Sequence, residues 1–227
     1  MVIIAYFIFY DIILNMKKKM IIFDFDGTLW DTTDLFFLFI QNKIKTQISV
    51  AEVRELYVHN IVVAFENLAK SYGLKSPEEI EKITLSYIKD KLNSSPFSHI
   101  QEMLGYLTEI GFNLAIVTVA KKINCLPLLQ KYDCEKYFQY IYTRDDFSIK
   151  TESVGKILEK ENLKIEEIIF VTDTLGDVRE MNVLGVETIA VTYGLHDRTF
   201  FEREKNENLI AIVNTVEELK NKLLELI

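Results

Sequence analysis

Two aspartates that stand two residues apart, Asp24 and Asp26, are the residues best placed for chemistry in this chain. The apolar run 20–23 precedes them and predicts a buried strand, and side chains at i and i+2 of an extended segment point to the same side. Gly27 lets the backbone turn sharply after them. Two neighbouring like charges are costly unless a cation or a shared proton relieves them. The pair is therefore a candidate for Mg²⁺ binding and for nucleophile-plus-acid chemistry, with an acidic turn as the alternative.

The composition predicts a folded, acidic protein. Of its 227 residues, 49% are hydrophobic and 12% aromatic. That length suits one domain of about 150 residues with a smaller second domain. Lys and Arg total 26 against 34 Asp and Glu, so the formal charge is −8, which argues against a nucleic-acid partner. Cys125 and Cys134 lack a metal-type or CxxC spacing, so we expect reduced thiols in a cytoplasmic protein.

The segment 1–19 requires a separate interpretation. Its apolar run, 1–10, comes before the lysine triplet 17–19, whereas a signal peptide carries its positive charge first. The run is also shorter than the roughly 20 apolar residues of a membrane-spanning helix. We expect an uncertain N-terminal extension, either an overlong start or a disordered tail, with a short membrane-touching anchor as the alternative. A membrane partner is not expected for the rest of the chain.

The stretch 34–95 predicts a small helical insert. Ser49 and Glu52 have the spacing of a capping box, which predicts a helix that continues to about Tyr72. His59 falls within this stretch and is a candidate ligand-facing residue. A histidine on a helix surface or in the core is the simpler interpretation.

The chain after the insert alternates between strand and helix patterns. Strands are expected at 112–118, 140–142, 168–172, 188–191 and 209–213. Such alternation predicts an α/β fold with a doubly wound parallel sheet covered on both faces by helices. The core would comprise 20–33 and 96–227, and the insert would form a cap domain.

Polar groups follow four of the expected strands, and in such sheets ligands bind outside the carboxyl ends of the strands. These groups are Asp24 with Asp26, Thr118, Lys150, and Asp173 with Asp177. Each alone has an ordinary explanation as a cap, a surface lysine or a solvated acidic pair. Together on one rim, they supply a nucleophile, an acid/base, two partners for phosphate oxygens and metal ligands.

With these motifs, the sequence resembles the haloacid dehalogenase (HAD) superfamily of Mg²⁺-dependent phosphohydrolases. Within it, the sequence is similar to the phosphoglycolate phosphatase-like group with a type-one helical cap. The first family motif, an apolar strand followed by Asp-x-Asp-Gly-Thr-Leu, is complete at 21–29. The second motif, a strand that ends in Ser or Thr, is met by Thr118.

The third and fourth motifs depart from the family pattern in backbone-shaping positions. Lys150 keeps the lysine of the third motif but lacks the proline that often follows it. Asp173 and Asp177 keep both acids of the fourth, with Thr172 where glycine is typical. These departures weaken the assignment to a subgroup more than the assignment to the family.

The resemblance implies a Mg²⁺-dependent phosphatase that acts on a small phosphorylated metabolite through an aspartyl-phosphate. Asp24 would be the nucleophile and Asp26 the general acid/base. The catalytic residues so implied are Asp24, Asp26, Thr118 and Lys150. The implied substrate-binding residues are Gly27, Thr28, Thr118, Val119 and Lys150. The implied Mg²⁺-binding residues are Asp24, Asp26, Asp173 and Asp177.

Asp26 also argues against halide displacement, because a departing halide needs no proton. A phosphotransferase or mutase of the same fold and a non-catalytic binding module remain as alternatives. Residues 34–95 contain no motif with a known chemical partner, so the identity of the substrate and the oligomeric state are not predicted. A small cap favours a small substrate, because closure must exclude bulk water.

Overall fold

The computed structural model describes residues 17–43, 49–58 and 86–226. Its strands are β1 (Met20–Phe23), β2 (Asn113–Val117), β3 (Phe138–Tyr142), β4 (Ile168–Thr172), β5 (Thr188–Val191) and β6 (Leu209–Val213). Its α-helices are α2 (Thr33–Lys43), α3 (Val50–Leu56), α6 (Ile100–Glu109), α7 (Lys122–Lys131), α8 (Lys150–Glu161), α9 (Leu175–Leu184), α10 (Arg198–Phe201) and α11 (Val216–Leu224). Residues 86–91 are also helical, and short 3-10 turns precede β3 and β4.

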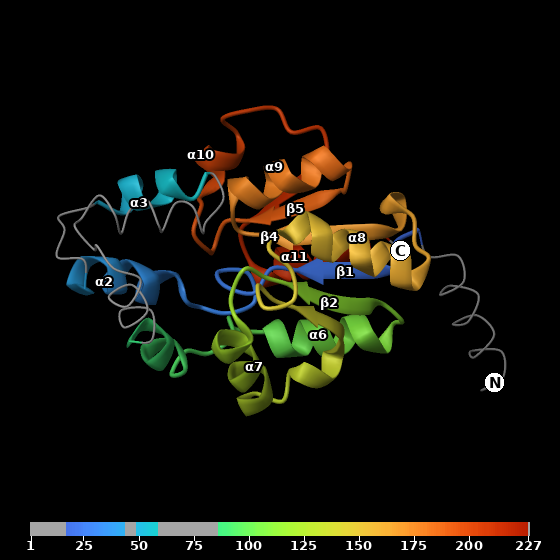
Figure 1. Cartoon of the computed structure of the whole chain (residues 1–227). Coiled ribbons are helices and arrows are strands. Elements are labelled where there is room, and N and C mark those ends of the chain that lie inside the picture. Colours follow the sequence, from blue (N-terminus) through green and yellow to red (C-terminus); the bar gives the residue numbers. More distant parts are fainter. Residues whose placement is uncertain (1–16, 44–48, 59–85, 227) are drawn as a thin grey trace.

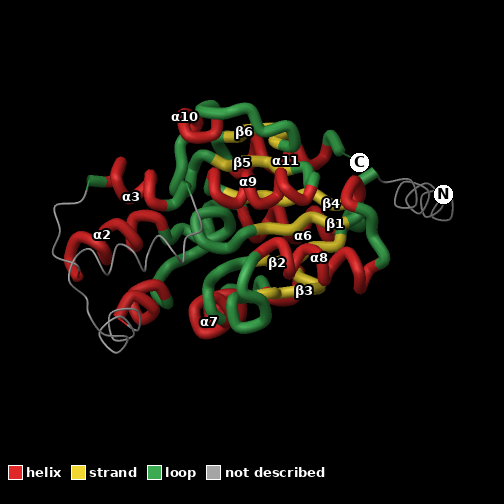
Figure 2. Tube along the Cα trace, turned by 45° about the horizontal axis from the view of Figure 1, so that its top comes forward, coloured by secondary structure: helices red, strands yellow, loops and turns green. Residues whose placement is uncertain are grey.

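The six strands form one parallel sheet in the order β3-β2-β1-β4-β5-β6 (Figure 1 and Figure 2). This confirms the predicted doubly wound α/β fold. The chain builds outward from β1 to β3, then returns to place β4 on the other side of β1. The carboxyl ends of β1 and β4 are therefore the topological switch point, where ligands bind in such sheets.

Helices cover both faces of the sheet, and the pattern of β1 explains why. Ile21 and Phe23 pack in the cluster that includes α6, α7 and α11. Met20 and Ile22 point to the other face, where the cluster includes residues of α8 and α9. All four side chains are fully buried, as expected of a central parallel strand.

The two segments that flank the expected insert, 34–95, pair with each other. Trp30 and Pro96 form an antiparallel bridge, and the Phe97 N–H donates to the Leu29 carbonyl at 3.1 Å. Helices α2 and α3 lie beyond the carboxyl ends of the strands (Figure 1). These two helices therefore adjoin the switch point.

Helix α3 begins as predicted but ends earlier. Ser49 and Glu52 form the capping box, with Ser49 Oγ accepting from the Glu52 N–H. The helix stops at Leu56, and Tyr57 takes the C-cap position, so the prediction that this helix reaches Tyr72 was wrong. Tyr57 is instead buried against Phe36 of α2, with ring centroids 5.1 Å apart. His59 lies outside the described residues.

Two of the lysines in the triplet pair with acids that directly precede β4 and β5. Lys18 is buried, donates to the Ile168 carbonyl at 2.9 Å and pairs with Glu187 at 2.7 Å. Lys19 pairs with Glu167. In the described ranges, no helix has the length and apolar character needed to cross a membrane. Cys125 and Cys134 are buried free thiols, as predicted.

Candidate active site

The first-motif loop leaves the sheet directly from β1. The Asp24 N–H still donates to the Val171 carbonyl of β4 at 2.9 Å, which holds the nucleophile candidate at the strand end. The Asp24 side chain is buried, whereas that of Asp26 is 33% exposed. Gly27 has φ +72°, a left-handed conformation that favours glycine. The loop therefore presents one aspartate inside the protein and the other at its surface.

Three backbone segments approach one another closely around Asp173. A Cβ on Gly27 would lie 2.0 Å from Asp173 Oδ2, and a Cβ on Gly194 would lie 2.2 Å from the Gly27 carbonyl oxygen. Any larger residue would push these segments apart. The two glycines thus allow the loops after β1 and β5 to meet the acid that follows β4.

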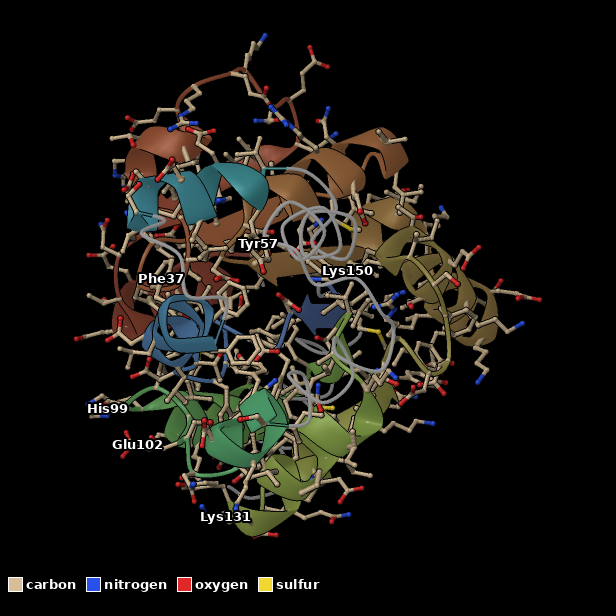
Figure 3. All side chains as sticks on the ribbon, turned by 60° about the vertical axis from the view of Figure 1, so that its left-hand side comes forward. Phe37, Tyr57, His99, Glu102, Lys131 and Lys150 are labelled. Atoms are coloured by element: carbon tan, nitrogen blue, oxygen red, sulfur yellow. The ribbon has the colours of Figure 1, made fainter. Side chains whose placement is uncertain are left out.

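Lys150 links two of the predicted acids. It is the first residue of α8, only 4% exposed, and is labelled in Figure 3. Its Nζ lies 2.8 Å from Asp24 Oδ1 and donates to Asp177 Oδ2 at 2.7 Å. Burial alone would lower the pKa of Lys150, but the two carboxylates raise it above its ordinary value. The side chain is therefore an ammonium at neutral pH, held between two acids.

Asp173 is buried and bound by neutral donors. The Thr28 hydroxyl donates to its Oδ1 at 3.0 Å, and the Leu195 N–H donates to its Oδ2 at 2.8 Å. Burial raises the pKa of Asp173 to about 8, and the nearby charge of Asp24 adds to the rise. Burial also raises the pKa of Asp24 to about 6, although the Lys150 ammonium opposes that shift. Three buried acids of the site therefore share one lysine, and burial with mutual repulsion keeps the pKa of Asp24 and of Asp173 high.

Of the remaining predicted residues, Asp177 contacts Lys150, and Thr118 and Val119 follow β2. Thr118 follows β2, the neighbour of β1, and its hydroxyl oxygen accepts from the Ala120 N–H at 3.1 Å. Val119 lies half-buried in the same turn. Asp177 lies in the first turn of α9 and accepts from the Thr172 hydroxyl at 2.6 Å. The threonine at the typical glycine position of the fourth motif thus orients the second acid of that motif.

Asp26 has a separate set of partners, which the sequence did not reveal. The Thr32 hydroxyl donates to Asp26 Oδ1 at 2.9 Å, and Lys91 Nζ lies 2.6 Å from each carboxylate oxygen. Lys91 comes from the helical end of the insert, 65 residues away in the chain. Nothing in the local pattern around Lys91 distinguishes it from a surface lysine on a helix.

The donor set fits Mg²⁺, which is usually held by one or two carboxylates with water and substrate phosphate completing its shell. Asp173 is a buried carboxylate that forms no ion pair with any described residue. Asp24 is close enough to raise its pKa. Within the described ranges, no three His, Cys, Asp or Glu side chains are gathered as a complete metal cage. A cation here would therefore rely on Asp24, Asp173, water and phosphate.

Known proteins resemble this chain over most of its length. A family model described as haloacid dehalogenase-like hydrolase matches residues 21–191. The pyrophosphatase PpaX of Halalkalibacterium halodurans is 27% identical over 194 residues, which cover 82% of this chain and 88% of that protein. A phosphoglycolate phosphatase of Mesorhizobium japonicum is 23% identical over 223 residues, which cover 92% and 96%.

A solved structure supports the fold. The crystal structure of a predicted phosphoglycolate phosphatase from Haemophilus somnus has a TM-score of 0.76 to this chain at 20% sequence identity. The match covers 93% of this chain and 99% of that one. At this level of identity, the likeness establishes the shared architecture.

Proposed function

Because this chain belongs to the haloacid dehalogenase-like hydrolase family, we propose that it is a Mg²⁺-dependent phosphatase of a small phosphorylated metabolite. The observation that carries the proposal is the Lys150 ammonium, 2.8 Å from Asp24 Oδ1 and 2.7 Å from Asp177 Oδ2 at the switch point of the sheet. A fixed cation beside a buried carboxylate nucleophile suits the transfer of a phosphoryl group, whose oxygens carry the charge.

Asp24 would begin the reaction. One of its carboxylate oxygens attacks phosphorus in line, the bond from phosphorus to the leaving oxygen breaks, and an aspartyl-phosphate forms. With a pKa of about 6, Asp24 is mostly ionised at neutral pH, as a nucleophile must be. Lys150 would bind a phosphoryl oxygen and so reduce the repulsion between the two anions.

The other core residues would hold and orient the phosphate. Asp24, Asp173 and the backbone carbonyl of Asp26 would hold Mg²⁺, which when bound would screen the charge between the carboxylate and the phosphate. The Thr118 hydroxyl already accepts from the Ala120 N–H, which leaves its proton for a phosphoryl oxygen. Asp177 would keep Lys150 in place through its 2.7 Å hydrogen bond.

Asp26 would move the protons. Its partly exposed carboxyl group lies two residues from the nucleophile, on the side that faces the insert. It would give a proton to the leaving oxygen, then take one from the water that attacks the aspartyl-phosphate. The second step releases inorganic phosphate and restores Asp24.

The test is the release of phosphate from p-nitrophenyl phosphate and a panel of phosphorylated metabolites, with Mg²⁺ and with excess EDTA. We expect Mg²⁺-dependent release that falls by at least about 10³-fold in Asp24→Asn, because no covalent intermediate can form. Asp90→Asn, an exposed change of the same kind, should leave the rate unchanged. Wild-type protein that releases no phosphate would contradict the proposal, and transfer to a sugar hydroxyl instead of water would indicate the phosphotransferase alternative.

A further inference from the structure

The loop that follows β5, residues 192–197, encloses the first acid of the fourth motif. In this loop, the Leu195 N–H donates to Asp173 Oδ2 at 2.8 Å. The next N–H, that of His196, donates to the Asp173 carbonyl at 3.2 Å. The loop therefore contacts both the side chain and the backbone of an acid that we assign to the Mg²⁺ site.

The imidazole of His196 joins two helix ends. The ring is fully buried, and its Nδ1 accepts from the Leu175 N–H at 2.8 Å. Leu175 is the first residue of α9, and the first N–H groups of a helix have no acceptor within it. Because Nδ1 accepts, the ring proton lies on Nε2, which donates to the Arg54 carbonyl in the last turn of α3 at 2.9 Å. One ring thus links the turn 173–175 to the insert.

The ring is also held on its face. Phe200 of α10 stacks on it, with ring centroids 4.3 Å apart and an angle of 4° between the planes. A ring that is hydrogen-bonded at both nitrogens cannot follow one partner without straining its bond to the other. A shift of α3 is therefore transmitted through His196 to the beginning of α9.

Other contacts also hold this part of the insert on the core. Arg54 pairs with Asp197 at 2.9 Å, but their side chains are 27% and 44% exposed, and water weakens such pairs. Val58, two residues beyond α3, packs in the buried cluster that includes Leu175. The apolar contact keeps α3 near the turn 173–175, and His196 adds a buried contact that depends on direction.

We propose that His196 is a positioning residue that couples the docking of α3 to the Mg²⁺ site, because it holds the turn 173–175 in the arrangement that binds the ion. The inference rests on the proposed function, since it takes Asp173 as a Mg²⁺ ligand. A docked α3 then favours Mg²⁺ binding. By thermodynamic linkage, bound Mg²⁺ must favour the docked α3 to the same extent, and this effect can be measured without turnover.

Asparagine at position 196 separates the two hydrogen bonds of the ring. In His196→Asn, the side-chain oxygen can still accept from the Leu175 N–H, but the side chain is too short to reach the Arg54 carbonyl. Asparagine therefore replaces a residue that only caps α9, but not one that couples α9 to α3. The matched control is His99→Asn, since His99 is 73% exposed and asparagine tolerates its φ of +67°.

The measurements are calorimetric titration of Mg²⁺ and hydrogen exchange of the α3 amides, with and without Mg²⁺, on the full chain. In wild type, we expect Mg²⁺ to slow exchange in α3 about tenfold. In His196→Asn, Mg²⁺ should slow it less than about twofold and bind about tenfold more weakly, because one buried hydrogen bond is lost. His99→Asn should match wild type in both measurements. Thermal unfolding shows whether each variant is folded.

A second variant tests the coupling from the insert. Val53 is a buried residue of α3, and Val53→Ala loosens the packing of that helix. It should weaken Mg²⁺ binding about threefold in wild type but leave it unchanged in the His196→Asn background, because both changes act through the same link. Val53→Ala alone decides the question if His196→Asn does not fold.

Two results would overturn the inference and leave the proposed function standing. One is equal slowing of α3 exchange by Mg²⁺ in wild type and His196→Asn, because His196 then only caps α9. The other is wild-type Mg²⁺ affinity in Val53→Ala. If wild type binds no Mg²⁺, the proposed function fails, and hydrogen exchange without metal decides the coupling. Val53→Ala must then speed exchange at 173–178 in wild type but not in His196→Asn, and no change in wild type rejects the link.

Discussion

Each aspartate of the first-motif loop faces a buried lysine, but the two lysines come from different parts of the chain. Lys150 begins α8 of the core and contacts both Asp24 and Asp177. Lys91 comes from the insert and contacts Asp26. Both side chains are less than about a twentieth exposed, so both ammonium groups act in a medium where charge interactions are strong.

The two pairs differ in how the segment that carries each lysine is anchored. Helix α8 packs against the sheet and α9, so Lys150 has a fixed position relative to the strand ends. Lys91 lies near the end of the insert, just before the linker that leads back to the core. Pro96 of that linker pairs with Trp30, which lies in the linker that leads into the insert. A core lysine is suited to the part of the reaction that all substrates share. Lys91 instead ties the returning end of the insert to the first-motif loop through Asp26.

The largest effect is expected when the Lys150 ammonium of the core pair is removed. Lys150→Met leaves Asp24 and Asp177 buried without their cation, which should cost about 3 kcal/mol of unfolding free energy. It should also lower kcat about 10³-fold, because a fixed charge that stabilises the transition state is removed. Lys156→Met, a change of a half-exposed lysine on the same helix, is the control for steady-state kinetics and urea unfolding. Activity within tenfold of wild type would show that Lys150 is structural alone.

A smaller effect is expected at the contact between the insert and the core at His196. His196 Nδ1 accepts from the Leu175 N–H at 2.8 Å, and its Nε2 faces the Arg54 carbonyl of α3 at 2.9 Å. The ring is therefore neutral, with its proton on Nε2. Burial lowers the pKa of His196 to about 4.

Below the ordinary pKa of about 6.5, the unfolded chain binds a proton that the folded protein rejects until about pH 4. Stability from this group is therefore present above pH 6.5 and is lost as the pH falls toward 4. In urea unfolding, we expect wild type to lose about 2 kcal/mol more than His196→Gln between pH 7 and pH 5, because the carboxyl groups of the site contribute equally to both proteins. The exposed His99→Gln should lose as much as wild type. An equal slope in both variants would contradict the assignment.

The smallest effect is expected at an exposed ion pair between insert and core. Glu55 of α3 pairs with Arg203, and both side chains are largely exposed to water. Glu55→Gln should change the unfolding free energy by no more than about 0.5 kcal/mol, because exposed pairs are screened and flexible. Values of kcat should stay the same. A large loss of activity would mean that surface charge, rather than the buried pair at Lys91, positions the insert.

Most of the local elements and the kind of chemistry were predictable from the order of the residues. The apolar runs predicted six strands that the structure contains, because a buried parallel strand needs apolar side chains on both faces. Parallel strands also bring their carboxyl ends to one edge. The positions of Asp24, Thr118, Lys150 and Asp173 on one rim therefore followed from the order of elements.

The tertiary structure alone decided which of those groups touch. Thr28 was expected to bind substrate, yet its hydroxyl donates to Asp173. The contact of Lys91 with Asp26 joins residues 65 apart, and Tyr57, at the C-cap of α3, packs on Phe36 of another helix. Hydrophobic periodicity predicts whether a side chain is buried, but it does not predict which residues that side chain packs against. A partner brought by a distant element is chosen by packing, which no local pattern encodes.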